Sequence, residues 1–312
     1  MLMVVLRRLA VSIPMIFIIA SLTFFLISLI PGDPAVSILG GDATPAEYAR
    51  VRAELGLDRP IFAQYVNWMV SALHGDLGNS LRTGRPVVEM IGERMQVTVS
   101  VAVIAIIVTA ILGVLIGLVG ALRSGWVGRS SQVVAVLGTS VPNFWFGILL
   151  VLIFAVTLGW LPATGYSPLE SGFVPWIQHL ILPVAAIAFA SIAGVARQTR
   201  AAMNEVLGRD FIRTLMASGA SYSRVVFVHG LRNAAIPVVT SLSFQFIGLL
   251  SGAIVVDQVF AMPGLGSIML VAINGRDVPV VQGVVILTTI LVLTVNLIVD
   301  LVNAWLNPKV RI

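Results

Sequence analysis

Six long stretches without a charged residue constrain this chain more than any other feature. They cover residues 9–32, 95–122, 130–169, 171–196, 233–256 and 278–299. A charged side chain at the bilayer centre costs about 2.5–3.5 kcal/mol on insertion scales, and a helix needs about 20 residues to cross the hydrocarbon core. Each stretch is long enough to cross. The pattern therefore predicts an all-α integral membrane protein with six transmembrane helices.

Turn residues at the flanks of these stretches place the six helices near residues 9–30, 97–121, 132–158, 177–197, 235–256 and 281–306. A further uncharged interval, 258–275, is shorter, and Pro263, Gly264, Gly266 and Gly275 interrupt it. Because Pro and Gly disfavour helix interiors, we expect a loop or a half-embedded segment there. The first stretch could also be a secretory signal peptide, but its apolar part is too long and lacks a small-x-small cleavage site, so we expect it to remain as an anchor.

Composition supports the membrane class and excludes several kinds of chemistry. Apolar residues make up 58% of the chain and charged residues 11%, whereas soluble domains carry about 25% charged residues. With no cysteine, a disulfide framework, a thiolate zinc site and an iron–sulfur cluster are excluded. The only lysine is Lys309, so no glycine-rich loop can present the lysine of a P-loop. The Arg residues are dispersed and form no stripe for nucleic acid.

The basic residues also predict orientation. A cytoplasmic N-terminus puts twelve basic residues in the cytoplasm and only Arg276 in the short outer loops. The twelve are Arg7, Arg8, Arg123, Arg129, Arg197, Arg200, Arg209, Arg213, Arg224, Arg232, Lys309 and Arg311. This distribution follows the positive-inside rule and predicts that both termini are cytoplasmic in a multi-pass protein of the cytoplasmic membrane.

Two polar segments divide the chain into an N-terminal helix (1–30), an extracytoplasmic subdomain (31–94) and a five-helix core (95–312). In the subdomain, Thr44 is expected to cap a helix that Pro45 begins and Gly56 ends, with a second helix over 62–73. The subdomain is either a lid that only packs on the outer face of the helices or a docking surface for a ligand carrier.

The second polar segment, 198–234, carries apolar residues that a solvated loop rarely has. Asp210 is expected to cap a short helix over 211–217 that Gly219 ends in a left-handed turn, and Ser221 or Ser223 to cap another from Arg224 onward. Phe211, Leu215 and Met216 share one side of the first helix. The segment is either a plug for another protein's groove or an amphipathic helix that lies among lipid headgroups.

Polar residues inside the predicted spans are few. Ser241, Gln245, Gly248 and Gly252 form a stripe along the fifth helix, which either lines a solute pathway or packs closely against another helix. Asn296, Asp300 and Asn303 share a face of the sixth helix, for an interhelical contact or a proton relay; a relay would need a second titratable partner at mid-membrane, which the sequence lacks. The three His are scattered, so the sequence predicts no catalytic constellation and no metal site.

Several motifs carry a resemblance that covers nearly the whole chain. They are Pro31-Gly32-Asp33-Pro34, Leu55-Gly56-Leu57-Asp58-Arg59-Pro60, Gly75-Asp76-Leu77-Gly78-Asn79-Ser80, Pro142-Asn143-Phe144-Trp145, the run from Arg209 through Gly219 to Pro237, and Pro263-Gly264-Leu265-Gly266. With these motifs the sequence resembles the permease subunits of bacterial ATP-binding-cassette (ABC) importers, in the dipeptide, oligopeptide and nickel branch. The resemblance implies a type I importer permease that moves di- or oligopeptides by alternating access.

The same resemblance implies partners and roles. It implies a second, homologous permease, two ATPase subunits that hold ATP and Mg, and an extracytoplasmic substrate-binding protein, with no cofactor on this chain. ATPase coupling falls to Asp210, Phe211, Arg213, Thr214, Leu215, Ala217, Gly219, Ala220, Arg224, His229 and Arg232. Binding-protein docking falls to Asp33, Asp58, Trp68, Pro263, Gly264, Gly266, Arg276 and Asp277. Within the coupling run the sequence departs from the general Glu-Ala-Ala pattern, with Arg213, Thr214 and Leu215 in those places.

The alternative function is a secondary carrier driven by an ion gradient. Such carriers usually place ionisable groups at mid-membrane and contain internal repeats. Every predicted helix centre here lacks charge, and the two halves of the sequence show no convincing repeat. The residues do not identify the solute.

Overall fold

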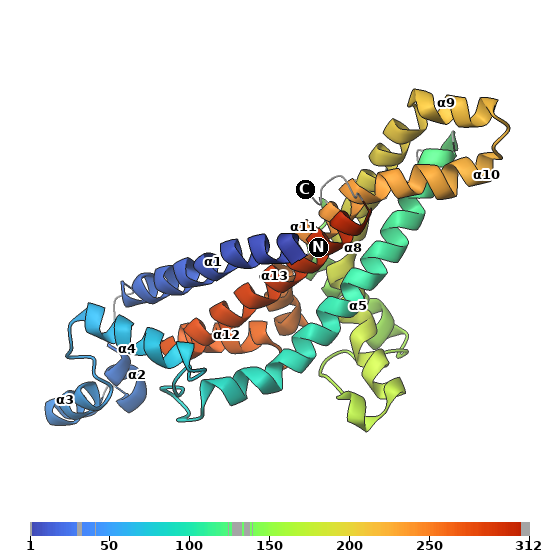
Figure 1. Cartoon of the computed structure of the whole chain (residues 1–312). Coiled ribbons are helices and arrows are strands. Elements are labelled where there is room, and N and C mark those ends of the chain that lie inside the picture. The colour runs from blue at the N-terminus through green and yellow to red at the C-terminus, as the bar shows by residue number, and fades with distance from the viewer. Residues whose placement is uncertain are drawn as a thin grey trace. The chain divides into compact units, whose positions relative to one another are not determined.

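The computed structural model describes residues 2–29, 33–40, 42–123, 125–126, 133, 138 and 140–306. Every regular element in this part of the chain is a helix, and one isolated bridge pairs Asn79 with Pro86 (Figure 1). Among the described residues, five helices are long and apolar enough to cross a membrane. They are α1 (Leu2–Ser28), α5 (Val87–Leu122), α8 (Phe173–Leu207), α11 (Leu231–Val259) and α13 (Val278–Leu306). Five of the six predicted spans are thus confirmed as helices.

The remaining predicted span, 132–158, lies partly outside the described residues. Its described end is α7 (Asn143–Leu150), which continues into the π-helical turn η1 (Val151–Thr157). Gly147 of α7 faces Phe260 and Ala186, because a Cβ at this glycine would lie 3.2 Å from the Phe260 ring and 3.4 Å from the Ala186 methyl. The described part of this span therefore packs through its Gly147 side, while side chains on its other sides, such as Trp145 and Val156, are 50% and 67% exposed.

Two of the long helices extend well beyond the predicted spans. The α5 helix has 36 residues and begins ten residues before the predicted start, and α8 has 35 residues and ends at Leu207. At about 1.5 Å per residue each is about 50 Å long, against about 30 Å of hydrocarbon. Absence of charge marks only the part within the bilayer, whereas Glu and Arg at the ends, such as Glu93 and Arg200, are good helix formers.

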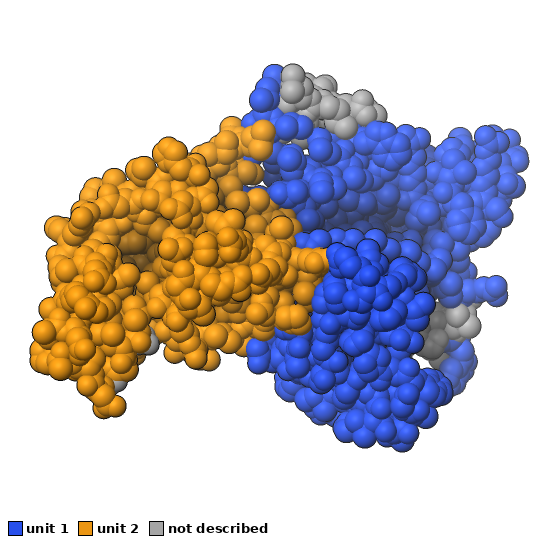
Figure 2. Space-filling model, turned by 90° about the horizontal axis from the view of Figure 1, so that it is seen from below, with its two compact units in different colours: residues 1–8, 99–262, 292–312 blue, residues 9–98, 263–291 orange. Residues whose placement is uncertain are grey.

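The chain forms two compact units (Figure 2). Unit 1 comprises residues 1–8, 99–262 and 292–312, and unit 2 comprises residues 9–98 and 263–291. The predicted extracytoplasmic segment 31–94 falls within unit 2.

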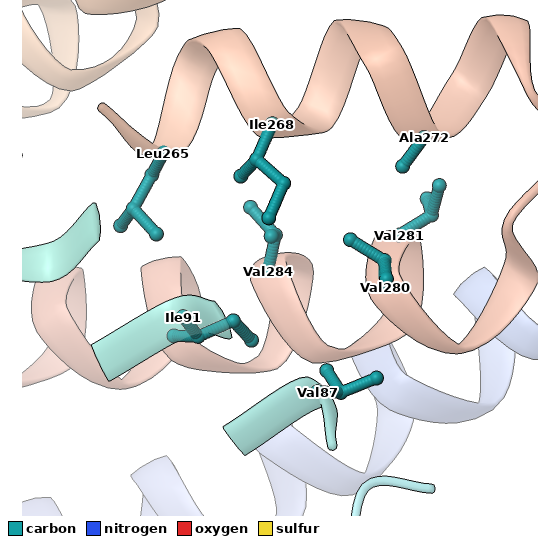
Figure 3. Packing of buried hydrophobic residues seen from close by; sticks show 8 residues of the cluster. All are labelled: Val87, Ile91, Leu265, Ile268, Ala272, Val280, Val281 and Val284. Carbon is teal, nitrogen blue, oxygen red and sulfur yellow. The ribbon is translucent and has the colours of Figure 1, made fainter. Parts of the chain in front are cut away.

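Unit 2 has its apolar core where the start of α13 meets α12 (Leu265–Asn274) and the start of α5 (Figure 3). Val87 and Ile91 come from α5, and Gly283 of α13 lies so close that a Cβ there would be 2.6 Å from Val87. The backbone N–H of Leu265 donates to the Thr98 hydroxyl at 2.8 Å. The expectation of a loop at 258–275 was partly wrong, because Gly264 and Gly275 flank a ten-residue helix instead of interrupting it. At ten residues α12 is too short to span.

The rest of unit 2 includes three short helices, α2 (Pro34–Leu39), α3 (Pro45–Glu54) and α4 (Ile61–Leu73). The predicted cap of α3 is confirmed: the Thr44 side chain accepts from the Glu47 N–H, and the Glu47 carboxylate accepts from the Thr44 N–H at 2.7 Å. Gly56 follows with a φ of +67°, the left-handed conformation that favours glycine. Local capping rules thus predict this segment well.

Unit 1 is built on α8, which packs against α11, α7 and α5. Two glycines of α5 allow the close approach to α8: a Cβ at Gly113 would lie 2.7 Å from Val195, and one at Gly117 would lie 2.5 Å from the Ala196 carbonyl oxygen. Thr199 of α8 is fully buried against Gly117. This is the small-residue packing that helices use within membranes.

Candidate functional sites

The predicted coupling helix is present as α9 (Asp210–Ala217), at the tip of unit 1 beyond the end of α8 (Figure 1). Its inner side is held by Ile212, which is 4% exposed, and α9 contacts the π-helical turn η3 (Val225–Gly230). Its outer side presents Phe211 at 38% exposure and Met216 at 49%. Gly219 ends the helix with a φ of +87°, as predicted. An anchored helix with an uncovered apolar side is thus the main feature of this tip.

Capping at the coupling segment differs from the prediction. Asp210 is the first helical residue and not the cap; Arg209 occupies the cap position without a side-chain hydrogen bond to the helix. The Asp210 carboxylate lies 3.5 Å from the Arg213 guanidinium and is exposed. Ser221 does precede α10 (Tyr222–Arg224), but its side chain makes no capping bond. As an acidic residue within the first turn, Asp210 still stabilises the helix through its dipole.

The second predicted coupling helix is not separate. Residues Tyr222–Val259 form one 38-residue helical segment, which runs from α10 through η3 into α11. Gly230, which lies between the two predicted helices, packs on α8, since a Cβ there would lie 3.3 Å from Met203 and 3.5 Å from Leu207. Tertiary packing therefore outweighs the local preference of the Gly and Asn residues in this stretch.

The remaining predicted coupling residues lie on or near this tip. Thr214 donates its hydroxyl to the Asp210 carbonyl at 3.2 Å, and the His229 carbonyl accepts from the Asn233 amide at 2.8 Å. Exposed members are Arg213, Thr214, Ala217, Gly219, Arg224 and Arg232, and half-buried members are Leu215, Ala220 and His229. An apolar cluster of Leu118, Ala202, Met203, Val206, Val226 and Ala234 joins the base of the segment to α5, α8 and α11. The tip is therefore fixed to three long helices.

The predicted pathway stripe lies along α11 (Leu231–Val259). Ser241, Gln245 and Gly252 are half-buried, and Gly248 is exposed with no atom within 4 Å of an ideal Cβ. The Gln245 amide lies across Gly194 of α8, where a Cβ would come within 2.4 Å of its nitrogen. The stripe therefore combines close packing at Gln245 with an open position at Gly248, so both interpretations retain support.

One polar neighbour of this stripe was not predicted. Asn143, the first residue of α7, places its amide nitrogen 3.6 Å from the Cβ position of Gly252. The signal was present in the sequence, because an Asn directly after Pro142 begins an otherwise apolar helix. Asn143 adds a second amide to the side of α11 that carries Gln245.

The polar face of α13 (Val278–Leu306) makes the predicted interhelical contacts. Asn296 accepts from the Ser243 hydroxyl, the Asn303 amide donates to Thr240 at 3.2 Å, and Asp300 pairs with Arg8 of α1 at 2.7 Å. The interhelical contacts are therefore present, and the proton relay stays untested. The partners Arg8 and Ser243 were not predicted, since residues this far apart in sequence show no common pattern.

The predicted docking residues all belong to unit 2, but they differ in exposure. Asp58 and Arg276 are exposed, Pro263, Asp33 and Trp68 are half-buried, and Gly264, Gly266 and Asp277 are buried. Asp277 accepts from the Ser80 hydroxyl at 2.5 Å and from the Leu81 N–H at 3.0 Å. Its buried carboxylate is therefore committed to holding the turn at 80–81, next to the exposed Arg276.

Asp33 is held by a local network. It caps α2, accepting from the Ala35 N–H at 3.0 Å, and it pairs with Arg52 of α3. The hydrogen bond from the Arg52 guanidinium holds the pKa of the Asp33 carboxyl below its ordinary value. Asp33 thus stays ionised at neutral pH and ties α2 to α3. Among the described residues, no group of three or more His, Asp or Glu lies close enough to hold a metal ion.

Comparison with known proteins gives matches over the whole chain. The family model "Binding-protein-dependent transport system inner membrane component" matches residues 110–312, and the model for the N-terminal part of such components matches residues 1–102. A Brucella abortus protein named as a peptide transport system permease is 42% identical over 308 residues, 98% of each chain. The glutathione transport system permease protein GsiC of Escherichia coli is 40% identical over 312 residues, 100% of this chain and 99% of that protein.

Among solved structures, a chain of the MetNI methionine ABC transporter in an inward-facing conformation aligns with a TM-score of 0.59. The alignment covers 70% of this chain and 97% of that one, at 18% identity. This similarity concerns the fold. The two family models and the full-length relatives show that the chain belongs to the family of inner-membrane permease components of binding-protein-dependent ABC transporters, which are not catalytic subunits.

Proposed function

We propose that this chain moves peptides, glutathione-like tripeptides included, across the cytoplasmic membrane by alternating access. The observation that carries the proposal is the full-length identity of about 40% to relatives named for peptide and glutathione transport. The amide of Gln245 and that of Asn143, which lies near Gly252 on the same stripe, support it, because a peptide bond that crosses a bilayer needs hydrogen-bond partners of this kind.

The proposed topology has six transmembrane helices in a type I importer arrangement, with both termini in the cytoplasm. The five long helices are joined in this proposal by a helix over 132–158, of which α7 (Asn143–Leu150) and η1 (Val151–Thr157) are described. The distribution of basic residues, twelve on the cytoplasmic side against only Arg276 in the short outer loops, supports the orientation. It places α9 in the cytoplasm and α2–α4 outside.

In this arrangement α9 is the surface that receives force from a separate ATPase. Phe211 and Met216 are exposed on a helix that Ile212 anchors, which fits a side that another protein covers. The partner supplies ATP and Mg, because this chain has a single lysine and no P-loop. A second permease completes the pathway, since the helices of one chain enclose little of it.

The proposed docking surface for the binding protein lies in unit 2. Arg276 and Asp58 are its exposed charged members, and Arg276 has a φ of +53° next to the buried Asp277. In this proposal Trp68, Asp277 and the two glycines Gly264 and Gly266 position the surface without direct contact.

Transport driven by a nucleotide separates this proposal from an ion-gradient carrier. The assembled transporter in proteoliposomes should take up a labelled peptide only with ATP, with its binding protein present, and unaffected by an uncoupler. Uptake that persists without ATP but collapses with the uncoupler would instead identify a secondary carrier.

Replacing Gln245 by Leu distinguishes a pathway from packing. We expect peptide uptake to fall severalfold while the thermal stability of the purified protein stays nearly unchanged, because Leu has a similar volume but no hydrogen-bonding amide. The control is Phe244→Leu on the same helix, which removes no polar group. Unchanged uptake in Gln245→Leu would restrict this residue to helix packing against Gly194.

A further inference from the structure

The helix α4 (Ile61–Leu73) has apolar side chains that pack on α1 and others that no part of the described chain covers. Tyr65 and Trp68 turn toward α1, whereas Phe62, Val66, Val70 and Leu73 are 66%, 42%, 51% and 64% exposed. Residues 62, 66, 70 and 73 lie on one side of the helix at the spacings of four and three that α-helices require. The α4 helix therefore carries an uncovered apolar stripe beside the side that packs on α1.

The contacts with α1 (Leu2–Ser28) set the level of α4 relative to the membrane. The Tyr65 and Ser21 hydroxyls share a hydrogen bond of 2.7 Å, and the Phe24 ring lies 5.4 Å from Tyr65 and 5.5 Å from Trp68. All of these α1 residues belong to its membrane-spanning part, Val5–Ser28. Ser21 lies seven residues before Ser28, which at about 1.5 Å per residue is about 10 Å inside the end of the span.

The composition of α4 fits that level. Its thirteen residues include no charged side chain, and its polar residues Gln64, Asn67 and Ser71 gather on the side opposite the apolar arc. Amphipathic helices of interfacial membrane proteins lie parallel to the membrane–water interface, with their apolar face buried about 5–10 Å into the boundary between headgroups and acyl chains. Tyr and Trp are enriched at the same level of membrane proteins.

Exposed apolar side chains also occur on α1 in the stretch that contacts α4. Leu22 and Leu26 of α1 are 55% and 61% exposed, and they belong to a candidate membrane span of which only 11% is buried. A bilayer that covers these residues of α1 reaches the level at which α4 is held.

We infer that α4 is embedded in the bilayer leaflet where α1 ends, with Phe62, Val66, Val70 and Leu73 in contact with acyl chains. The connection between α3 and α5 is then anchored in the membrane and does not stand free above it. This inference concerns lipid contact and holds whatever solute the transporter moves.

The absence of cysteine from the chain makes a direct test possible. Single variants Val66→Cys and Val70→Cys, and the matched variants Asn67→Cys and Ser71→Cys on the polar side, are labelled with an environment-sensitive fluorophore. Each full-length chain is reconstituted, with the subunits that copurify with it, in vesicles of phosphatidylethanolamine and phosphatidylglycerol. A nitroxide near the headgroup end of the lipid acyl chain and aqueous iodide serve as quenchers.

We expect labels at 66 and 70 to emit at shorter wavelength and to be quenched severalfold more by the nitroxide lipid than labels at 67 and 71, with the reverse order for iodide. Equal quenching by iodide at all four positions would place α4 in water and overturn the inference. Labels at 66 and 70 that neither quencher reaches would show that protein covers the stripe, which also overturns it. Peptide uptake by each variant confirms that the labelled proteins are assembled.

Discussion

Replacing Phe211 by Asp is expected to lower ATP-driven uptake at least tenfold while the protein still inserts and folds. Phe211 is part of the exposed apolar side of α9, and it is 38% exposed. Full burial of such a side chain contributes about 1.5–3 kcal/mol, so covering the exposed part contributes about 0.6–1 kcal/mol. At about 1.4 kcal/mol per tenfold, losing this contact weakens docking about three- to sixfold, and the cost of burying a carboxylate at the same place raises the effect beyond tenfold.

The fold should tolerate this change for a local reason. Phe211 is the second residue of α9, and an acidic residue in the first turn interacts favourably with the helix dipole. Ile212, which holds α9 on its inner side, is left in place. A loss of uptake with unchanged thermal stability would therefore report on docking.

Two variants control for charge and for side-chain size. Ser221→Asp adds the same charge at an exposed position that precedes α10, and Phe211→Leu keeps an apolar side chain. Both should retain most of the uptake and of the permease-dependent stimulation of ATP hydrolysis. If Phe211→Asp behaves like these controls in both assays, then α9 does not transmit force from the ATPase.

Replacing Gly117 by Ala should destabilise the protein more than any other single methyl group added to α5. The new Cβ would lie 2.5 Å from the Ala196 carbonyl oxygen and 2.6 Å from the Thr199 Cβ, so α5 and α8 must separate. Overpacking of this kind costs about 1–3 kcal/mol. For a chain of this size the melting temperature of the detergent-solubilised protein should fall by about 2–10 °C.

Gly92→Ala is the matched control, because it makes the same substitution in the same helix where no atom lies within 4 Å of the new Cβ. Alanine has the higher helix propensity, so this variant should be as stable as the parent or slightly more stable. Equal melting temperatures for the two variants would show that α5 and α8 do not approach closely at Gly117.

The sequence predicted five of the membrane spans and the cap of α3 because both depend on nearby residues. Hydropathy locates the part of α8 within the bilayer, and the Thr44 and Glu47 pair is a short-range signal. Where helices end outside the bilayer depends on packing, so the extension of α8 to Leu207 and the fusion of α10 with α11 were missed. In both cases apolar contacts, such as those of Met203 and Val226, decide the outcome.

At the candidate sites, too, the sequence predicted what depends on nearby residues and missed what depends on distant ones. Helical spacing correctly placed Phe211 and Met216 on exposed positions of α9 and the polar residues of α13 at contacts. It could not identify their distant partners, since Arg8 and Asp300 are separated by 292 positions in the chain. Nor could it distinguish the exposed Arg276 from the buried Asp277, because the two are adjacent and both charged.

The unbroken helical segment Tyr222–Val259 has a geometric consequence. Phe227, near its exposed tip, and Gly248, on the open stripe, are 21 positions apart along this segment, about 32 Å at the usual rise. Two features between them allow the segment to bend: Phe227 lies in the π-helical turn η3 (Val225–Gly230), and Pro237 lies inside α11. The stiffness of the segment at these two points therefore sets how far a displacement of the α9 tip changes the opening beside Gly248.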